Sequence, residues 1–286
     1  LEMIRELFDL PGSSVQEVIS DARDKEGKNA EESERFGKKC MEDGDYLGAI
    51  DHFRSALEQS PKDKHEALVN LGAAFESAGE APQAYKQFKK ALVLKESSDI
   101  YQGISSIQAQ SGRKADALKS LRDAIEAEPY NAYGFFKLAE ALRKMGYRKR
   151  AYEAMNSAIS LAADDQFYHF WTGDLLVEMR QFEDAVESFH AALELSPGDD
   201  HLYLLLGVAF YGAGKQQEAI RSIRLAGDLH AEGRLAFGLL KCLYEHMGKG
   251  EEAKQEEERA SEMDPYESDR LVRLKKILQL TEADLS

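Results

Sequence analysis

The chain has 286 residues, of which 43% are hydrophobic and 31% are charged, and it contains six prolines and two cysteines. This composition is typical of a globular protein and excludes collagen-like, mucin-like, disulfide-scaffold and low-complexity classes. The 37 basic residues stand against 52 acidic ones, so the formal net charge is -15. A charge of this sign opposes binding to nucleic acid and to anionic membrane surfaces.

The chain lacks the features of an exported or membrane-inserted protein. No stretch approaches the roughly 20 consecutive apolar residues that span a bilayer, and the first residues lack the basic and apolar regions of a signal peptide. Cys40 and Cys242 suggest neither a disulfide nor a metal site, which fits a reducing compartment. We therefore expect a cytoplasmic protein, and the start at Leu1 and Glu2 leaves open whether the chain is a fragment.

The first predicted element is an amphipathic arm over residues 1–29. Ser14 and Glu17 have the spacing of a capping box at the start of a helix, and a second short apolar segment precedes Pro11. Two interpretations of residues 3–28 remain open. The arm caps the following repeats, or it docks in a groove, either its own or that of a neighbouring copy.

Alanines then recur with a period of 33 to 35 residues through most of the chain. The first of each repeat is Ala49, Ala84, Ala117, Ala151, Ala185, Ala219 or Ala253, and the second follows seven residues later, at Ala56, Ala91, Ala124, Ala158, Ala192, Ala226 or Ala260. Between them stand the large residues Phe53, Phe88, Leu121, Met155, Phe189 and Ile223, with Glu257 in the last repeat. Alanines seven apart lie on one helix face and allow a neighbouring helix to approach closely.

Small residues, turn glycines and prolines share this period. Upstream of the alanines lie Gly37, Gly72, Ser105, Ala139, Gly173 and Gly207, where two helix axes must come near each other, and Lys241 departs from this series. Seven residues later come Gly44, Gly79, Gly112, Gly146, Gly214 and Gly248, which can end a helix in the left-handed conformation, with Arg180 in the fifth repeat. Pro61, Pro129, Pro197 and Pro265 end four of the second helices. The pattern predicts seven helix hairpins.

These residues resemble the tetratricopeptide repeat, a helix-turn-helix of 34 residues with small residue, alanine, aromatic, alanine and proline at fixed offsets. The resemblance covers residues 30–266, with repeats that start near residues 30, 65, 98, 132, 166, 200 and 234. It implies an all-α fold, a right-handed solenoid of seven repeats with capping helices at both ends. Lys241 and Glu257 occupy packing positions of the seventh repeat, so we expect that repeat to depart most from normal packing.

The last predicted element is a helix within residues 267–286. Leu271, Leu274, Ile277 and Leu278 form one apolar stripe beside basic residues. Because terminal repeats need a polar outer face, we expect this helix to cap the stack.

The candidate catalytic and metal-binding motifs lack the neighbouring residues and the secondary structure that such sites require. Cys242 and His246 lie four residues apart but have no carboxylates in the same arrangement, so a structural role is favoured over metal binding. The segment from Gly212 to Lys215 resembles a phosphate loop but coincides with a repeat turn. We therefore expect no enzyme, no cofactor and no metal.

In the family, the second, fifth, sixth, ninth and twelfth positions of each repeat face a peptide ligand on the concave side. For repeats four to six, this resemblance implies a partner-binding set of Phe136, Lys137, Glu140, Arg143, Phe170, Trp171, Asp174, Leu204, Val208 and Tyr211. The same positions also include Tyr133, Phe167 and Leu205, whereas the second and third repeats are more polar there. The lysine and asparagine clamp that binds chaperone tails in the family is absent.

The apolar members of this set predict a binding groove, because a contiguous apolar patch on a soluble protein usually marks an interaction site. The alternative is that several of them pack in the core, since Leu204 begins a run of three leucines. The basic residues Arg143, Lys144, Arg148, Lys149 and Arg150 have the pattern of solvated turn residues. If Lys137, Arg143 and Lys144 point inward instead, the groove favours a ligand with an apolar anchor and an acidic flank.

The sequence thus predicts a non-enzymatic adaptor that binds a peptide or a partner helix in its concave groove, through apolar anchors with an acidic flank. The alternative is a self-assembling scaffold, a homo-oligomer in which residues 3–28 dock in the groove of a neighbouring copy.

Overall fold

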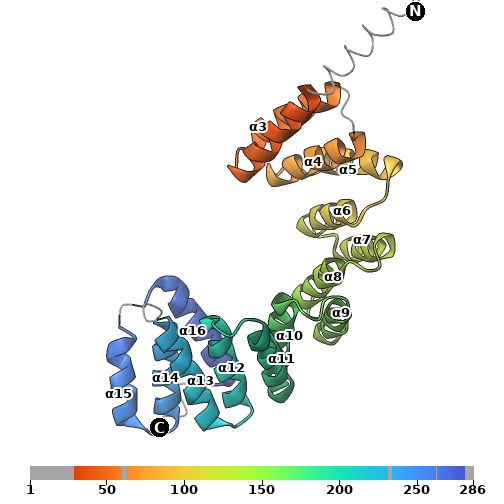
Figure 1. Ribbon diagram of the computed structural model, residues 1–286. Coiled ribbons are helices and arrows are strands. Elements are labelled where there is room, and N and C mark those ends of the chain that lie inside the picture. The colour runs from red at the N-terminus through yellow and green to blue at the C-terminus, as the bar shows by residue number, and fades with distance from the viewer. Residues whose placement is uncertain (1–28, 60–62, 231–233, 262, 281–286) are drawn as a thin grey trace, which may run out of the picture. The chain divides into compact units, whose positions relative to one another are not determined.

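The computed structural model describes residues 29–59, 63–230, 234–261 and 263–280 (Figure 1). The predicted arm over residues 3–28 lies outside the described residues. Every regular element in the described part of the chain is a helix, so the fold is the predicted all-α helical repeat. None of these helices is long and apolar enough to cross a membrane.

The chain divides into two compact units, residues 1–130 and 131–286, which we call the N-terminal and the C-terminal unit. The N-terminal unit holds a helical stretch over residues 29–42, followed by α3 (Tyr46–Glu58), α4 (Lys64–Ser77), α5 (Ala81–Leu94), α6 (Ser98–Gln110) and α7 (Lys114–Ala127). Within it α4 pairs with α5 and α6 with α7, so consecutive helices form hairpins.

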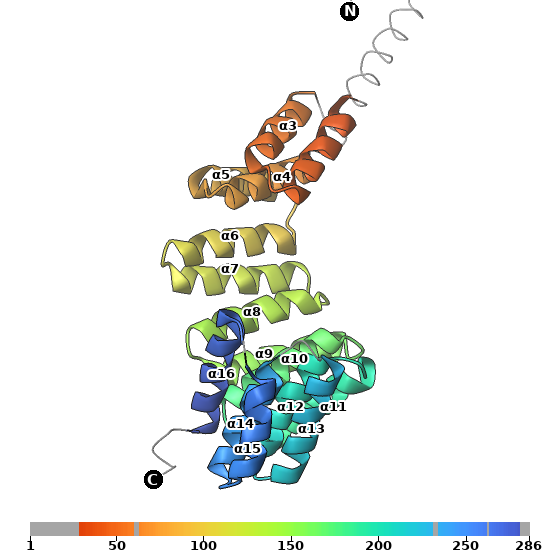
Figure 2. The same cartoon turned by 90° about the vertical axis from the view of Figure 1, so that its left-hand side faces the viewer.

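The C-terminal unit is also built of helix hairpins and contains all of the predicted partner-binding residues. Its helices are α8 (Ala132–Lys144), α9 (Arg148–Leu161), α10 (Gln166–Glu178), α11 (Phe182–Leu195), α12 (Asp200–Gly212), α13 (Gln216–Leu229), α14 (Leu235–His246), α15 (Gly250–Arg259) and α16 (Pro265–Leu278). Figure 2 shows the hairpins of this unit from a second direction. The first helices of its repeats, α8, α10, α12 and α14, form what we call the inner face.

Local sequence signals determine where these helices begin and end. Asn131, Asp165 and Asp199 each accept a hydrogen bond from a backbone N–H of the helix that follows, which satisfies one of the free donors at a helix start. Between the two helices of a hairpin the chain takes a positive φ, between 71° and 82° at the six turn glycines. Arg180 adopts the same left-handed conformation, with φ of 61°.

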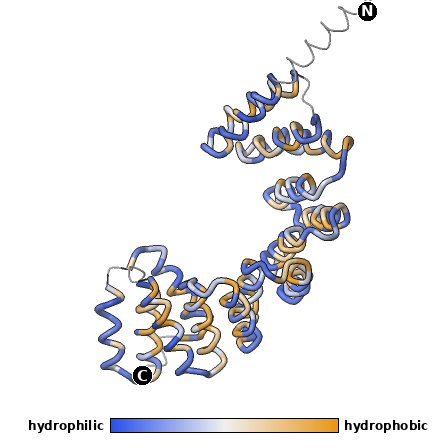
Figure 3. The backbone as a smooth tube through the Cα atoms, viewed as in Figure 1, coloured by the Kyte–Doolittle hydropathy of each residue, from blue (hydrophilic) through white to orange (hydrophobic). Residues whose placement is uncertain are grey.

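The repeated alanines and small residues lie where helices approach each other. Ala185 and Ala192 are completely buried, and a Cβ atom on Gly173 would lie 2.6 Å from the ring of Phe189. The large residue of the second helix therefore fills the space that the small residue of the first helix leaves. Figure 3 shows the resulting alternation of apolar and polar segments along the helices.

The seventh repeat still forms a hairpin of α14 and α15, although Lys241 and Glu257 replace small and apolar residues. The two departures compensate each other, because Lys241 Nζ lies 2.6 Å from Glu257 Oε1. Only Ala253 and Glu256 of α15 are buried, so α15 presents a polar outer surface at the end of the stack. The expectation that this repeat departs most from normal packing is confirmed in its second helix, because α15 has 10 residues, whereas α5, α7, α9, α11 and α13 have 14 each.

The helix expected near the C-terminus is α16, and its position differs from that of a helix that continues the stack. Such a helix would contact α15, whereas α16 packs on α14 and α12. Gly238 of α14 provides the close approach, since a Cβ atom there would meet Met263 and Leu271. The C-terminal helix therefore lies on the inner face.

Candidate functional site

Four of the side chains expected to face solvent on the inner face lie in the core. Phe136 is 6% exposed, Leu204 and Leu205 are 4% and 5% exposed, and Val208 is fully buried. The interpretation of these residues as exposed ligand contacts is wrong, and the alternative that they pack in the core is confirmed for these four. The three residues of α12 are buried because α12 contacts α10, α11, α13 and α16, so neighbouring helices cover several of its sides. Phe136 of α8 packs against the rings of Phe167 and Trp171.

A second group of aromatic side chains remains partly exposed on α8 and α10. Tyr133 is 46% exposed and Phe167 is 40% exposed, while Phe170 and Trp171 are half-buried. We call these four residues the aromatic surface. Tyr211, also expected in the binding set, is half-buried on α12.

The buried Phe136 ring supports the aromatic surface from below. Its centroid lies 4.7 Å from that of Phe167, 5.5 Å from that of Trp171 and 5.7 Å from that of Tyr133. Phe170 continues the cluster, with its centroid 5.8 Å from that of Trp171. The pairs Phe136–Phe167, Phe136–Trp171 and Phe170–Trp171 are edge-to-face, a geometry that favours aromatic contacts, and Tyr133 is tilted against Phe136.

Beside the aromatic surface, Arg143 joins two carboxylates of α10. Its Nη2 atom lies 2.6 Å from Asp174 Oδ2 and 2.8 Å from Glu178 Oε1, and its guanidinium carbon lies 5.1 Å from the centroid of the Trp171 ring. Burial opposes the charge of Arg143, but the hydrogen bonds with Glu178 and Asp174 outweigh it and raise the pKa of the guanidinium. Arg143 is thus a fixed part of the surface.

Two other cations of this region are also paired with a carboxylate, whereas two lie exposed. Lys137 and Lys144 both donate to Glu140, each over 2.7 Å. Lys149 and Arg150 are exposed at the start of α9. Since Lys137, Arg143 and Lys144 are each paired with a carboxylate of the chain, they no longer indicate a ligand with an acidic flank.

The helix α16 adds charged contacts that the sequence did not reveal. Arg273 Nη2 lies 2.9 Å from Glu178 Oε1 on α10, and Arg270 Nη2 lies 2.9 Å from Nδ1 of His201 on α12. Arg180 Nη1 donates to the carbonyl of Ile277 over 3.1 Å. These residues lie 69 to 97 positions apart in the sequence.

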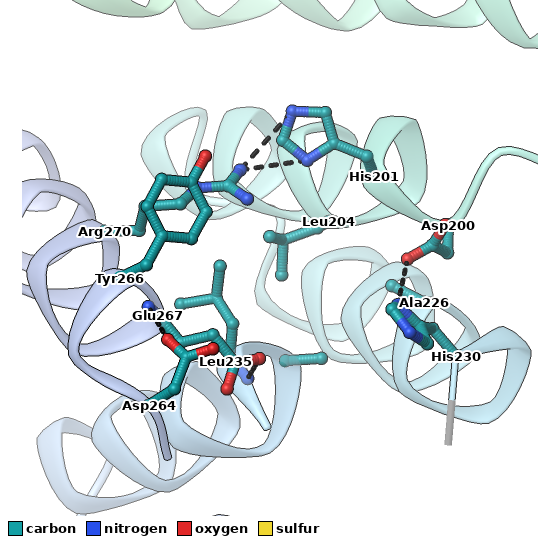
Figure 4. A pocket seen from close by; sticks show the side chains of 11 residues that line it. Asp200, His201, Leu204, Ala226, His230, Leu235, Asp264, Tyr266, Glu267 and Arg270 are labelled. Atoms are coloured by element: carbon teal, nitrogen blue, oxygen red, sulfur yellow. Dashed lines mark hydrogen bonds and ion pairs between the residues drawn. The ribbon is translucent and has the colours of Figure 1, made fainter. Parts of the chain in front are cut away.

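Two cavities lie beside α16. A cleft of about 440 Å³ lies between α16 and the helices α10 and α12, with Phe170, Trp171, Asp174, Arg270 and Leu274 among its lining residues. A more polar pocket of about 550 Å³ lies at the N-terminal end of α16 (Figure 4). In that pocket Glu267 accepts hydrogen bonds from the backbone N–H groups of Arg234 and Leu235 at the start of α14.

Figure 4 shows the imidazole of His201 next to the guanidinium of Arg270 in the lining of this pocket. Burial and the charge of Arg270 lower the pKa of His201, while Asp199, Asp200 and Asp174 oppose that shift. Arg270 can only donate, so the short contact requires a neutral imidazole whose nitrogen accepts.

We therefore expect acid to weaken the docking of α16. Away from Arg270 and exposed to water, His201 returns toward its ordinary pKa of 6.5. The undocked state then binds a proton at higher pH than the docked state, so docking is strongest above pH 6.5 and weakens as the pH falls from there to the lowered pKa. The check is acrylamide quenching of Trp171, the only tryptophan, between pH 8 and pH 5. His201→Gln should reduce the pH dependence in this window, and an unchanged profile would contradict the assignment.

Cys242 and His246, which were considered as metal ligands, do not belong to a cluster. Burial raises the pKa of the Cys242 thiol, which disfavours the thiolate that metals require. Within residues 29–59, 63–230, 234–261 and 263–280, no group of three or more His, Cys, Asp or Glu side chains could hold a metal ion.

Comparison with known proteins agrees with the repeat pattern. Family models described as tetratricopeptide repeat match residues 40–99 and 172–232, and residues 98–131 and 132–165. Human protein O-mannosyl-transferase TMTC1 is 30% identical over 96 residues, which are 34% of this chain and 11% of that protein. Photosystem I assembly protein Ycf3 of Parasynechococcus marenigrum (strain WH8102) is 32% identical over 103 residues, 32% of this chain and 60% of that protein. The chain therefore matches only part of either relative.

Solved structures show the same fold at low identity. The C-terminal part of a TPR repeat-containing protein from Cytophaga hutchinsonii has a TM-score of 0.67 at 16% identity, over 84% of this chain and 98% of that one. YrrB, described as a TPR protein with an unusual peptide-binding site, has a TM-score of 0.52 at 23% identity, over 64% of this chain and 95% of that one. Together with the hairpins, the family matches show that this chain belongs to the tetratricopeptide repeat family.

Proposed function

We propose that the chain is a protein-interaction module that binds a partner segment at the aromatic surface of the C-terminal unit. Proteins of this family generally mediate protein–protein interactions. The observation that supports this surface is the group of Tyr133, Phe167, Phe170 and Trp171, which stay partly exposed around a buried ring. Preoriented aromatic side chains are common anchors of binding energy, because they bury much apolar area and lose little conformational entropy.

The charges at this surface modify the proposal that the sequence favoured. Lys137, Arg143 and Lys144 are neutralised by Glu140, Asp174 and Glu178, so the partner is selected by apolar anchors rather than by an acidic flank. Asp174 and Glu178 are both less than one-fifth exposed; Asp174 lines the cleft beside α16, and Glu178 contacts Arg273 of α16. The absence of enzymatic activity, of a cofactor and of nucleic-acid binding stays a prediction.

The test uses peptides selected from a phage-displayed random library on the full chain. Tyr133→Ala combined with Phe167→Ala removes two exposed anchors, and we expect the selected peptides to bind the variant about 30-fold more weakly, which corresponds to about 2 kcal/mol. Fluorescence anisotropy of labelled peptides gives the dissociation constants. These residues are preferable to Trp171, whose ring also contacts Arg143.

The matched control is Tyr130→Ala, because Tyr130 is 88% exposed and lies outside the aromatic surface. We expect this variant to bind the same peptides as the wild type does. Peptides that bind both variants equally well, or a library that yields no binder at all, would contradict the proposal. Circular dichroism of each variant shows whether its helices remain folded.

A further inference from the structure

The position of α16 on the inner face shows what kind of segment that face accepts. The polar helix α15 already ends the stack, since only two of its side chains are buried. The apolar stripe of α16 lies instead against α12 and α14, and Leu274 is the buried side chain of α16. In this structure α16 thus occupies a surface formed by the first helices of successive repeats.

Charge complementarity orients α16 on this surface. Glu178, which is 19% exposed, accepts from Arg143 and from Arg273 of α16, and Arg273 also lies 4.0 Å from Asp174. Asp174 and Glu178 together carry two negative charges. Arg143 pairs with both of them, Arg148 Nε lies 3.8 Å from Glu178 Oε2 and is 51% exposed, and Arg273 makes a closer contact of 2.9 Å with Glu178. An incoming segment that brings a cation to α10 therefore meets two carboxylates that accept more than one guanidinium group.

The turn between α10 and α11 contributes a second contact. Six of the corresponding turns contain glycine with positive φ, whereas here Arg180 adopts a φ of 61°. The left-handed conformation is less favourable for a residue with a side chain than for glycine. The Arg180 guanidinium donates a hydrogen bond to the Ile277 carbonyl in the last turn of α16, which offsets part of this cost. A cation at this position also interacts favourably with the negative end of the helix dipole.

The contact between α16 and the inner face is incomplete. A cleft of about 440 Å³ remains beside Phe170 and Trp171, and on α16 itself Tyr266 and Val272 are 69% and 66% exposed. Because α16 leaves such a cleft and buries few side chains, an external segment that fills the inner face better can displace it. The affinity of the inner face for that external segment is lowered only by the free energy needed to displace α16.

We propose that the inner face of α10, α12 and α14 is a helix-binding site, that α16 is its intramolecular occupant, and that the external partner is an amphipathic helix with the same pattern. That pattern is two arginines one turn apart, followed by leucine and isoleucine, as in Arg270, Arg273, Leu274 and Ile277. The inference rests on the proposed function and specifies the partner and its competition with α16.

The experiment uses the full chain and a fluorescent peptide of residues 263–280. Arg270→Glu combined with Arg273→Glu reverses the charges that face His201 and Glu178 and should detach α16. We expect acrylamide quenching of Trp171, which lines the cleft, to increase in this variant and to decrease again when the peptide is added. The peptide should bind the variant at least about 10-fold more tightly than the wild type, whose site is occupied. Lys276→Glu, a charge reversal at an exposed position of the same helix, is the matched control and should behave as the wild type does.

Competition then tests the chemistry of the partner. An alanine-based helix that carries only the two arginines, the leucine and the isoleucine at the spacing of α16 should displace the labelled peptide, and the same helix with glutamates for the arginines should not. Unchanged quenching of Trp171 in the double variant would overturn the assignment of α16 as the internal occupant. So would a labelled peptide that does not bind the double variant, or that binds it no more tightly than it binds the wild type. Equal competition by the two helices would overturn the partner chemistry.

The result is distinguishable from that of the library experiment. Library peptides that depend on Tyr133 and Phe167, together with a peptide of residues 263–280 that does not bind, would leave the proposed function standing and refute the role of α16. If the peptide of residues 263–280 binds as expected but the library peptides do not depend on Tyr133 and Phe167, partner binding is restricted to the inner face of α10, α12 and α14.

Discussion

Replacing Arg143 with alanine is expected to lower the free energy of unfolding of the C-terminal unit by about 3 kcal/mol. The variant would leave Asp174 and Glu178 close together without the cation that lies 2.6 Å from one and 2.8 Å from the other. Removing one partner of a largely buried ion pair costs more than the pair itself contributes, because the remaining charge stays desolvated. Arg273 and Arg148 reach Glu178 but compensate only in part, since both are more than half exposed.

Urea denaturation followed by the fluorescence of Trp171 measures this effect in the C-terminal unit. Arg143→Lys should recover only part of the loss, because an ammonium group cannot make the two-pronged contact with Glu178. Arg150→Ala is the matched control, an exposed cation of the same basic segment, with an expected change within about 0.5 kcal/mol. Equal stabilities of the Arg143→Ala and Arg150→Ala variants would contradict the assignment.

Acid should reduce the difference between wild type and Arg143→Ala. Burial alone would raise the pKa of Glu178, but Arg143, Arg273 and Arg148 lower it below its ordinary value of 4.5. The stabilisation that this carboxylate provides is therefore fully present above pH 4.5 and is lost as the pH falls through the lowered pKa. Denaturation curves at neutral and acidic pH would show this convergence.

Gly173→Ala is expected to destabilise the C-terminal unit by about 2 to 3 kcal/mol, although it adds a single methyl group. That methyl carbon would lie 2.6 Å from the Phe189 ring, which is completely buried. In an exposed helix the same substitution would be stabilising, because alanine has the higher helix propensity. The sign of the effect thus reports the close approach of α10 and α11.

A double-mutant cycle separates the steric cause from other effects. Phe189→Leu removes the ring that the new methyl group meets, so Gly173→Ala should cost clearly less in that background. Gly198→Ala is the control, since a Cβ atom there has no neighbour within 4 Å and its φ is not left-handed. Additive effects of the changes at Gly173 and Phe189 would show that the two residues do not interact.

The close approach of Gly173 to Phe189 could be predicted from the sequence, and so could the hairpins themselves. The period of the alanines, the small residues and the turn glycines is local information, and it directly determines which helix positions can come near each other. The helices α6, α8, α10 and α12 accordingly begin at Ser98, Ala132, Gln166 and Asp200, the starts expected from the repeat.

The exposure of individual side chains depended on the tertiary structure. Leu204, Leu205 and Leu206 are all buried, although three successive residues cannot share one helix face. They are buried because α12 has neighbours on several sides, which periodicity within one helix does not reveal. Tyr133 and Phe167 occupy ligand-facing positions of the repeat, but only their exposure in the structure distinguishes them from Phe136.

The sequence alone thus determined the family, the all-α repeat and the packing positions within each hairpin, because these follow from contacts that recur every 34 residues or so. Only the tertiary structure decided the pairing of Arg143 with α10 and the placement of α16 on the inner face. Arg143 lies 31 and 35 positions from Asp174 and Glu178, about one repeat, but the repeat pattern does not specify which charged side chains pair. The contacts of α16 join residues far outside the repeat period, such as Arg273 and Glu178, 95 positions apart. A single sequence carries no local signal for contacts of this kind, since they depend on how the chain returns after the last repeat.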